Sequence, residues 1–141
     1  MWIGTKWGLN SYDQSELKNY FHVRKQPNTL PDNYIRFIAE APTGHLYVST
    51  NKGVAIYDKT ENQFHPLLYK GNIFQAWSYY QTDDGFLFGG EETLYKYNWT
   101  DKSIKPVFPN INGDQHKCIN RILLWKPGLL IASSRKDGLW M

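Results

Sequence analysis

The sequence predicts an all-β fold, a fragment of a β-propeller with about three and a half four-stranded antiparallel blades. Two observations lead to this prediction. Short runs rich in Ile, Val, Tyr and Phe are separated by Gly, Pro, Asn and Asp along the chain, which is typical of antiparallel strands joined by tight turns. The run at 47–58 also recurs about 45 residues earlier, at 2–13, and a period of about 40 to 45 residues indicates a propeller blade.

The repeat is carried by residues of the same type at the same places. The matched pairs are Thr5 with Thr50, Gly8 with Gly53, Tyr12 with Tyr57 and Asp13 with Asp58. The pattern continues later in the chain, where 94–97 matches 54–57 and Gly138 matches Gly53. Because one such sheet cannot bury both of its faces alone, we expect neighbouring repeats to stack on each other.

Composition is consistent with this fold and excludes several other classes. The chain has 141 residues, 16% of them aromatic, and a formal net charge of +3, so nothing points to nucleic acid or to an anionic membrane surface. No run approaches the roughly 18 apolar residues of a membrane span. Met1 leads directly into a strand pattern, so we expect no leader peptide in this sequence. The single cysteine, Cys118, excludes an internal disulfide and is expected to be a small buried hydrophobic residue.

The first half of the chain is predicted to hold one blade remnant and one complete blade. Residues 1–23 form the remnant, which lacks its first strand, and 24–33 form a crossover. The complete blade runs from 34 to about 69. The predicted strands are 2–5, 9–12 and 20–23 in the remnant, and 34–40, 45–50, 54–57 and 64–69 in the complete blade.

The second half is predicted to repeat this arrangement. A complete blade runs from about 74 to 108, a polar crossover from 109 to 117, and a second remnant from 118 to 141. The predicted strands are 74–81, 86–89, 93–99 and 104–108, then 118–125, 129–133 and a third strand that begins at Gly138. The run Gly89-Gly90-Glu91-Glu92 replaces the Thr-x-x-Gly turn of the earlier repeats.

Two runs carry a resemblance to a known family: Trp2-Ile3-Gly4-Thr5-x-x-Gly8-Leu9-x-x-Tyr12-Asp13 and Leu30-Pro31-Asp32-Asn33-x-Ile35-x-x-Ile38-x-Glu40-x-x-x-Gly44. They resemble the two-component regulator propeller repeat, which builds the periplasmic sensor domain of hybrid two-component systems in Bacteroidetes. The resemblance covers nearly the whole chain and is most specific in the first two repeats. It implies a parent protein with two seven-bladed propellers, a small β-sandwich, a membrane span and a histidine kinase, and it places the sensor on the periplasmic side of the inner membrane.

The candidate ligand-binding residues lie on the turns between second and third strands, on the crossovers and on the innermost strands. In propellers these turns and crossovers form one rim of the central channel. The candidates are Lys6, Trp7, Asn33, Arg36, Lys52, Trp77, Arg121 and Arg135. Aromatic rings flanked by polar groups suit sugar binding, since a ring stacks on C–H faces while fixed polar groups bind the hydroxyls. For any one of these residues, simple packing or solvent exposure is the alternative.

Other polar residues are given structural roles. Asp13 and Asp58 are predicted to bond their own backbone at a turn, and Asp83-Asp84-Gly85 is predicted to be a hairpin turn. His22 and His65 both follow Phe, so they are interpreted as equivalent architectural positions. No Cys or His spacing matches a metal site, and we expect neither a metal nor a cofactor.

The predicted function is non-catalytic ligand sensing, with an oligosaccharide-type ligand in the parent protein and a signal passed to its histidine kinase. One alternative is a propeller glycoside hydrolase or lyase, but paired carboxylates are needed for that chemistry and the predicted innermost strands contribute only Glu40. A protein-interaction scaffold is the other alternative. The parent's membrane span is the only expected link to a membrane.

The expected partner is a second copy of the chain. An arc of blades leaves the outer faces of its first and last blades bare, and unpaired strand edges recruit partners. We therefore expect self-association, and a dimer could complete a seven-bladed ring.

Overall fold

The computed structural model describes residues 1–107, 118–135 and 138–141. Their regular structure consists of strands β1 to β16, arranged in small antiparallel sheets, so the all-β prediction is confirmed. The chain forms two compact units, Met1–Gln75 and Ala76–Met141, and each is described by itself. Within the described residues, no helix has the length and apolar character needed to cross a bilayer.

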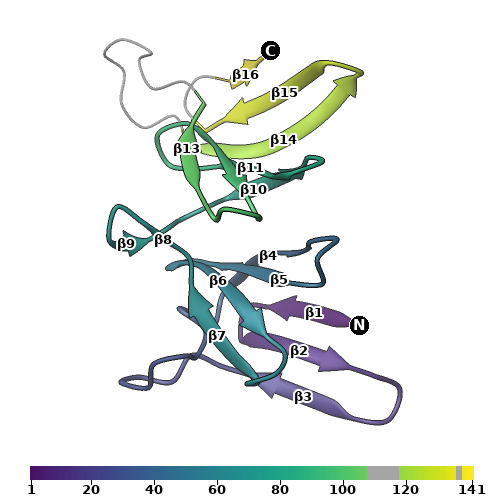
Figure 1. Ribbon diagram of the computed structural model, residues 1–141, viewed down its shortest axis with the longest axis vertical. Coiled ribbons are helices and arrows are strands. Elements are labelled where there is room, and N and C mark those ends of the chain that lie inside the picture. Colours follow the sequence, from purple (N-terminus) through teal and green to yellow (C-terminus); the bar gives the residue numbers. More distant parts are fainter. Residues whose placement is uncertain (108–117, 136–137) are drawn as a thin grey trace. The chain divides into compact units, whose positions relative to one another are not determined.

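The first sheet contains β1 (Trp2–Thr5), β2 (Gly8–Tyr12) and β3 (Leu17–Tyr20), in that order (Figure 1). The prediction that its last strand spans 20–23 is wrong. Asp13 Oδ1 accepts hydrogen bonds from the backbone N–H groups of Ser15, at 3.2 Å, and Glu16, at 2.9 Å. Because this turn is tight, the next strand begins at Leu17, which pairs with Tyr12.

The second sheet contains β4 (Ile35–Glu40), β5 (Leu46–Thr50), β6 (Gly53–Asp58) and β7 (Gln63–Pro66). The first three predicted strands are confirmed to within one residue at each end. The fourth was predicted to reach residue 69 and ends earlier. Lys70 and Gly71 both have positive φ, 50° and 80°, as in a type I′ turn. They pair β8 (Leu68–Tyr69) with β9 (Asn72–Ile73) as a separate hairpin.

The first and second sheets pack face to face around one core. Its fully buried members are Leu9, Leu30, Leu46, Val48, Ala55 and Phe64, with Trp2, Tyr20, Ile35, Ile38 and Tyr57 packed against them. The Trp2 ring lies 5.0 Å from the Tyr57 ring, edge to face, a geometry that aromatic pairs favour. The prediction that neighbouring repeats stack is therefore confirmed for these two sheets.

A hydrogen-bonded group crosses the same interface. The hydroxyls of Tyr20 and Tyr57 lie 3.2 Å apart, and both donate to Asn62 Oδ1, at 3.0 and 2.8 Å. Burial is the main reason that the pKa of Tyr57 is raised above its usual value, and the Tyr20 hydroxyl adds to the effect. Because partners satisfy these hydroxyls, the rings can be placed in an apolar interface without a large desolvation cost.

The third sheet contains β10 (Ser78–Gln81), β11 (Gly85–Gly89), β12 (Leu94–Asn98) and β13 (Ile104–Pro106). Its first strand was predicted to begin at residue 74 and begins four residues later. Phe74 bonds into the first unit instead: its N–H donates to Leu67 O at 2.7 Å, and its carbonyl accepts from Val54 N at 2.8 Å. The last residue of the predicted strand 104–108 lies outside the described residues.

The fourth sheet contains β14 (Ile119–Lys126), β15 (Leu129–Ser134) and β16 (Gly138–Trp140). It joins the third sheet through two hydrogen bonds: the Ser78 side-chain Oγ donates to Ile119 O at 3.0 Å, and the backbone Ile119 N donates to Gly90 O at 3.0 Å. A Cβ at Gly89 would collide with Ser78 Oγ and with the Ile119 carbonyl. Only glycine therefore allows this approach. The predicted crossover at 109–117 lies outside the described residues.

Candidate functional site

The turn between β1 and β2 exposes two of the candidate residues. Thr5 Oγ1 donates to Gly8 O at 3.0 Å and accepts from Trp7 N at 2.9 Å. Gly8 has φ 133°, a value that side-chain-bearing residues rarely adopt. With the turn fixed by Thr5 and Gly8, the side chains of Lys6 and Trp7 extend into solvent, and Trp7 is 80% exposed.

The turn between β5 and β6 is a second copy of the same structure. Thr50 Oγ1 donates to Gly53 O at 2.8 Å and accepts from Lys52 N at 3.2 Å, and Gly53 has φ 131°. Asn51 and Lys52 are exposed at its tip. The sequence match between the two Thr-x-x-Gly runs is therefore confirmed at the level of individual hydrogen bonds.

The equivalent turn of the third sheet is built differently. Gly90 takes the place of the threonine and Thr93 that of the glycine, and Gly90 N donates to Thr93 O at 2.9 Å. Its exposed tip carries Glu91 and Glu92. The Glu91 carbonyl accepts from Cys118 N at 2.6 Å, so this turn is tied to the start of the fourth sheet. The charge of the tip is thus negative here and positive in the first two sheets.

Arg36 and Trp77 occupy the same register position in the second and third sheets; Asn120 holds that position in the fourth sheet, and Arg121 is one position further along. The pairing is irregular between Ile35 and Phe37 and between Ile119 and Arg121, which leaves Arg36 and Asn120 at bulges. In the third sheet, the N–H of Trp77 donates to the carbonyl of Gly89, the residue that is the register partner of Ser78. A bulge changes the direction in which a side chain points. Arg36 and Trp77 are half-buried, and Arg121 is exposed.

The last two candidates have local roles in the described structure. Asn33 is half-buried, and its Oδ1 accepts from the backbone N–H of His22 at 2.7 Å, so it fixes the crossover between the first two sheets. Arg135 is exposed, and its backbone N–H donates to Cys118 O at 3.1 Å. The candidates divide between the units: Lys6, Trp7, Asn33, Arg36 and Lys52 belong to the first, and Trp77, Arg121 and Arg135 to the second.

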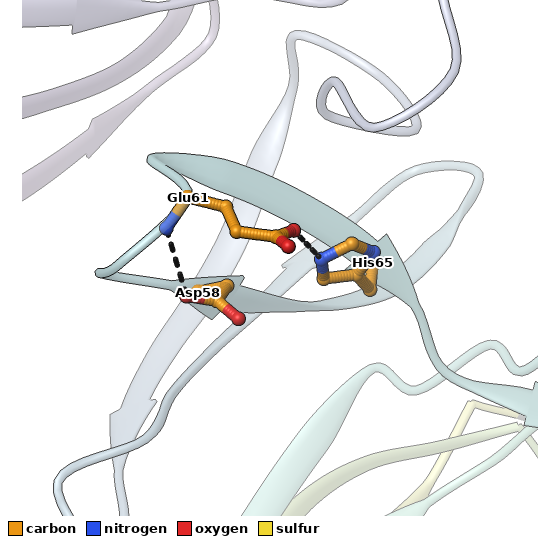
Figure 2. Close-up of side chains that lie close together, drawn as sticks. All are labelled: Asp58, Glu61 and His65. Atoms are coloured by element: carbon orange, nitrogen blue, oxygen red, sulfur yellow. Dashed lines mark hydrogen bonds and ion pairs between the residues drawn. The ribbon is translucent and has the colours of Figure 1, made fainter.

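One cluster was not singled out from the sequence. Asp58, Glu61 and His65 come together at the β6–β7 turn, with one potential ligand atom of each within 4.8 Å of the others (Figure 2). Glu61 Oε2 lies 3.3 Å from His65 Nε2, and Asp58 Oδ1 accepts from the N–H groups of Thr60 and Glu61. Those backbone hydrogen bonds, led by Glu61, hold the pKa of Asp58 below its usual range.

The first sheet shows that this cluster is a turn motif. There Asp13 Oδ1 accepts from the backbone N–H of Glu16, and the Glu16 side chain forms an ion pair with Lys18 at 3.3 Å. Lys18 pairs with Ser11, and His65 pairs with Ile56 at the matching position of the second sheet. Because the ammonium group of a lysine is not a metal ligand, the feature common to both sheets is a glutamate carboxylate beside a nitrogen-bearing side chain.

This register also corrects the interpretation of the histidines. His65 is equivalent to Lys18, so the prediction that it is equivalent to His22 is wrong. His22 lies beyond β3, where its Nδ1 is 2.7 Å from Leu30 O. The error has a simple origin: the β2–β3 turn is shorter than the β6–β7 turn, and that difference displaces the match between the outer strands.

The predictions for the aspartates at turns are confirmed. Asp13 and Asp58 both cap their turns, and the third sheet repeats the motif with Asn98, whose Oδ1 accepts from Thr100 N at 2.8 Å and Asp101 N at 3.3 Å. The hairpin predicted at Asp83-Asp84-Gly85 closes through Thr82 N to Gly85 O, at 3.0 Å. Asp84 Oδ2 forms an ion pair with Lys96 at 2.8 Å.

Comparison with known proteins gives structural matches. The sequence matches no protein-family model and no curated protein. Two structures of the extracellular domain of BT4673 from B. thetaiotaomicron match with TM-scores of 0.76. The first, at 26% identity, names BT4673 as a proposed one-component system. The second, at 22% identity, names it as a proposed hybrid two-component system. The extracellular domain of BT3049 from B. thetaiotaomicron, named as a proposed hybrid two-component system, matches with a TM-score of 0.66 at 24% identity.

Each match covers 98% of this chain. This chain has the fold of a part of those extracellular domains. It spans 18% of the BT4673 chains and 20% of the BT3049 chain. The resemblance drawn from the repeat motifs is thus confirmed by structure, and the chain is a propeller-like set of small antiparallel sheets.

Proposed function

We propose that the chain is a non-catalytic, ligand-sensing part of the extracellular domain of a hybrid two-component system, on the periplasmic side of the inner membrane. The single observation that carries the proposal is the match to BT4673 over 98% of the chain, with a TM-score of 0.76. In such a system, a ligand that binds one packing of the sheets better than another would bias the kinase.

The state of the carboxylates supports a non-catalytic role. A glycoside hydrolase needs a carboxylic acid whose pKa is raised beside a second carboxylate. In the described part of the chain, the carboxylates whose pKa departs from the usual range are all shifted downward, at Asp13, Asp58, Asp84 and Asp101. Each accepts hydrogen bonds at a turn or hairpin, which favours the ionised form.

The Thr5–Gly8 turn supports an oligosaccharide as the ligand. Trp7 presents an exposed ring at a turn held by two hydrogen bonds, with Lys6 beside it. An indole face stacks on the C–H surface of a sugar, and an ammonium group donates to its hydroxyls. Because the turn is already ordered, binding would not require the backbone to be fixed first.

Titration calorimetry of the 141-residue chain against a panel of neutral and acidic oligosaccharides tests this proposal. We expect one class of oligosaccharide to bind, and Trp7→Ala to weaken that binding roughly fivefold, because a stacked aromatic ring contributes about 1 kcal/mol. Trp125→Ala is the matched control, since Trp125 is also exposed but lies at the other end of an innermost strand, beside the β14–β15 turn.

Two results would contradict the proposal. Cleavage of any oligosaccharide in the panel would identify an enzyme. Absence of binding to the whole panel, with retained folding, would favour the interaction scaffold. An equal loss of affinity in Trp7→Ala and Trp125→Ala would show that the β1–β2 turn is not part of the binding site. It would not contradict the proposal that the chain senses a ligand.

A further inference from the structure

The two Thr-x-x-Gly turns of the first unit lie at the same edge of its stacked sheets. A Cβ at Gly4 would collide with the Ile35 side chain, so the end of β1 touches the start of β4. Ile35 in turn pairs with Thr50, at the end of β5. These contacts define a turn edge, formed by residues 5–8, 34–36 and 50–53. Its position is set by the stacking of the first two sheets on each other.

Each turn at this edge has a lysine and an exposed aromatic residue next to each other. In the first sheet, Lys6 directly precedes the exposed Trp7. In the second sheet, Lys52 lies at the tip, and the backbone N–H of Asn51 donates to the carbonyl of Tyr34 at 3.1 Å. This hydrogen bond places Tyr34, which is 40% exposed, next to the tip. The two lysine–aromatic pairs belong to consecutive sheets, and sheets that stack face to face lie about 10 Å apart.

The carboxylates of the first unit gather away from the turn edge. Residues 1–75, all of which the structure describes, contain six Asp and Glu residues. Five of them lie at the opposite edge of the sheets, at the β2–β3 and β6–β7 turns and at the end of β4: Asp13, Glu16, Glu40, Asp58 and Glu61. The sixth, Asp32, lies in the crossover, where its Oδ1 accepts from the backbone N–H groups of Asn33, at 2.6 Å, and Tyr34, at 3.4 Å.

The turn edge carries cations. Lys6 and Lys52 are exposed at the two tips, and Arg36 lies at the β4 bulge, one residue after Ile35. The crossover adds Arg24 and Lys25, both exposed. The formal net charge of the whole chain, +3, does not show this separation of charge along the strands. Because charges of one sign gathered on a surface raise the local concentration of the opposite ion, this edge attracts anions.

We propose that the turn edge binds an acidic oligosaccharide, one whose sugar rings carry carboxylate groups. The inference rests on the proposed sensing function and names its class of ligand. Trp7 and Tyr34 stack on the C–H faces of the sugar rings, while Lys6 and Lys52 donate to the carboxylates. A neutral oligosaccharide uses the rings but not the positive charge, and an inorganic anion uses the charge but not the rings. A chain of uronic acids uses both.

Titration calorimetry with matched probes tests the proposal. The probes are the α-1,4-linked trimers of galacturonate and of galactose, which differ only in a carboxylate against a hydroxymethyl group, and tripolyphosphate as an anion without a sugar ring. We expect the galacturonate trimer to bind roughly tenfold or more tightly than either of the others. Lys6→Gln and Lys52→Gln should each weaken its binding roughly fivefold. Lys59→Gln is the matched control and should leave binding unchanged, because Lys59 is an exposed lysine at the opposite edge.

Any of four outcomes would overturn the proposal: no binding of the galacturonate trimer; equal or tighter binding of the galactose trimer; tripolyphosphate binding as tightly as the galacturonate trimer, which would indicate a cationic patch without sugar recognition; or equal losses in Lys52→Gln and Lys59→Gln. Circular dichroism checks that each variant is folded. The proposed function fails separately, when no oligosaccharide of the wider panel binds, so binding of a neutral sugar alone would overturn this inference and leave sensing in place.

Discussion

The two faces of the first sheet should respond very differently to the same truncation. Leu9 and Leu17 are both leucines of this sheet, but Leu9 is 0% exposed in the core against the second sheet while Leu17 is 61% exposed on the opposite face. Leu9→Ala removes buried apolar surface and leaves a cavity. We expect it to lower the free energy of unfolding by about 3 kcal/mol.

Leu17→Ala is the matched control, and its effect should stay within about 0.5 kcal/mol. Urea denaturation followed by circular dichroism measures both, at a protein concentration low enough for the chain to be monomeric. A loss below about 1 kcal/mol for Leu9→Ala would refute the stacking of the first two sheets on this face. So would an equal loss for the two variants.

Two further predictions concern the repeated turns. Gly53→Ala should destabilise the chain by about 2 kcal/mol or more in the same assay, because Gly53 combines φ 131° with close contacts to Ile73 and the Phe74 carbonyl. Gly44→Ala, at φ 84° with open space around the glycine, should cost about 1 kcal/mol, and equal losses would contradict the steric argument. The backbone hydrogen bonds to Asp13 and Asp58 lower both folded-state pKa values, so their contribution to stability is present above the unfolded pKa of about 4 and is lost as the pH falls through the folded values. Thermal unfolding between about pH 2 and 6 should therefore show a weaker acid destabilisation in the Asp13→Asn/Asp58→Asn variant, whose amide oxygens can still cap the turns; an unchanged pH profile would contradict this assignment.

The fold was predictable because its determinants are local and repeated. A threonine and a glycine three residues apart fix each of the first two β-turns through the same pair of hydrogen bonds. The aspartates after Tyr12 and Tyr57 bond the backbone two and three residues ahead. Such signals lie within a few neighbouring residues, so they can be read without knowing the tertiary structure.

The errors arose where contacts distant in sequence decide the local structure. Phe74 is a residue type that favours strands, but its backbone is hydrogen-bonded to Leu67 and Val54. β10 therefore begins at Ser78 and not at Phe74 as predicted. The turn at Lys70 and Gly71 separates a hairpin from the strand predicted before it. For this hairpin a local signal did exist, since glycine in a two-residue turn is a recognised hairpin pattern.

The candidate site was predictable only in part. Exposure of Lys6, Trp7 and Lys52 follows from the turn that carries them, and the structure places all three at turn tips. The role of Asn33 could not be inferred in the same way, because its side chain binds the backbone of His22, 11 residues away. Sequence identifies the turn, whereas the partner of a polar side chain depends on how the crossover folds back.

Solution NMR would test the central claim, the stacking of consecutive sheets in register, most directly. The account predicts nuclear Overhauser effects between the ring protons of Trp2 and Tyr57, whose ring centroids lie 5.0 Å apart, together with cross-strand contacts that pair Leu9 with Tyr20 and Tyr57 with Phe64. A folded chain that lacked the Trp2–Tyr57 contact, or that paired Leu9 with a residue beyond Tyr20, would contradict it.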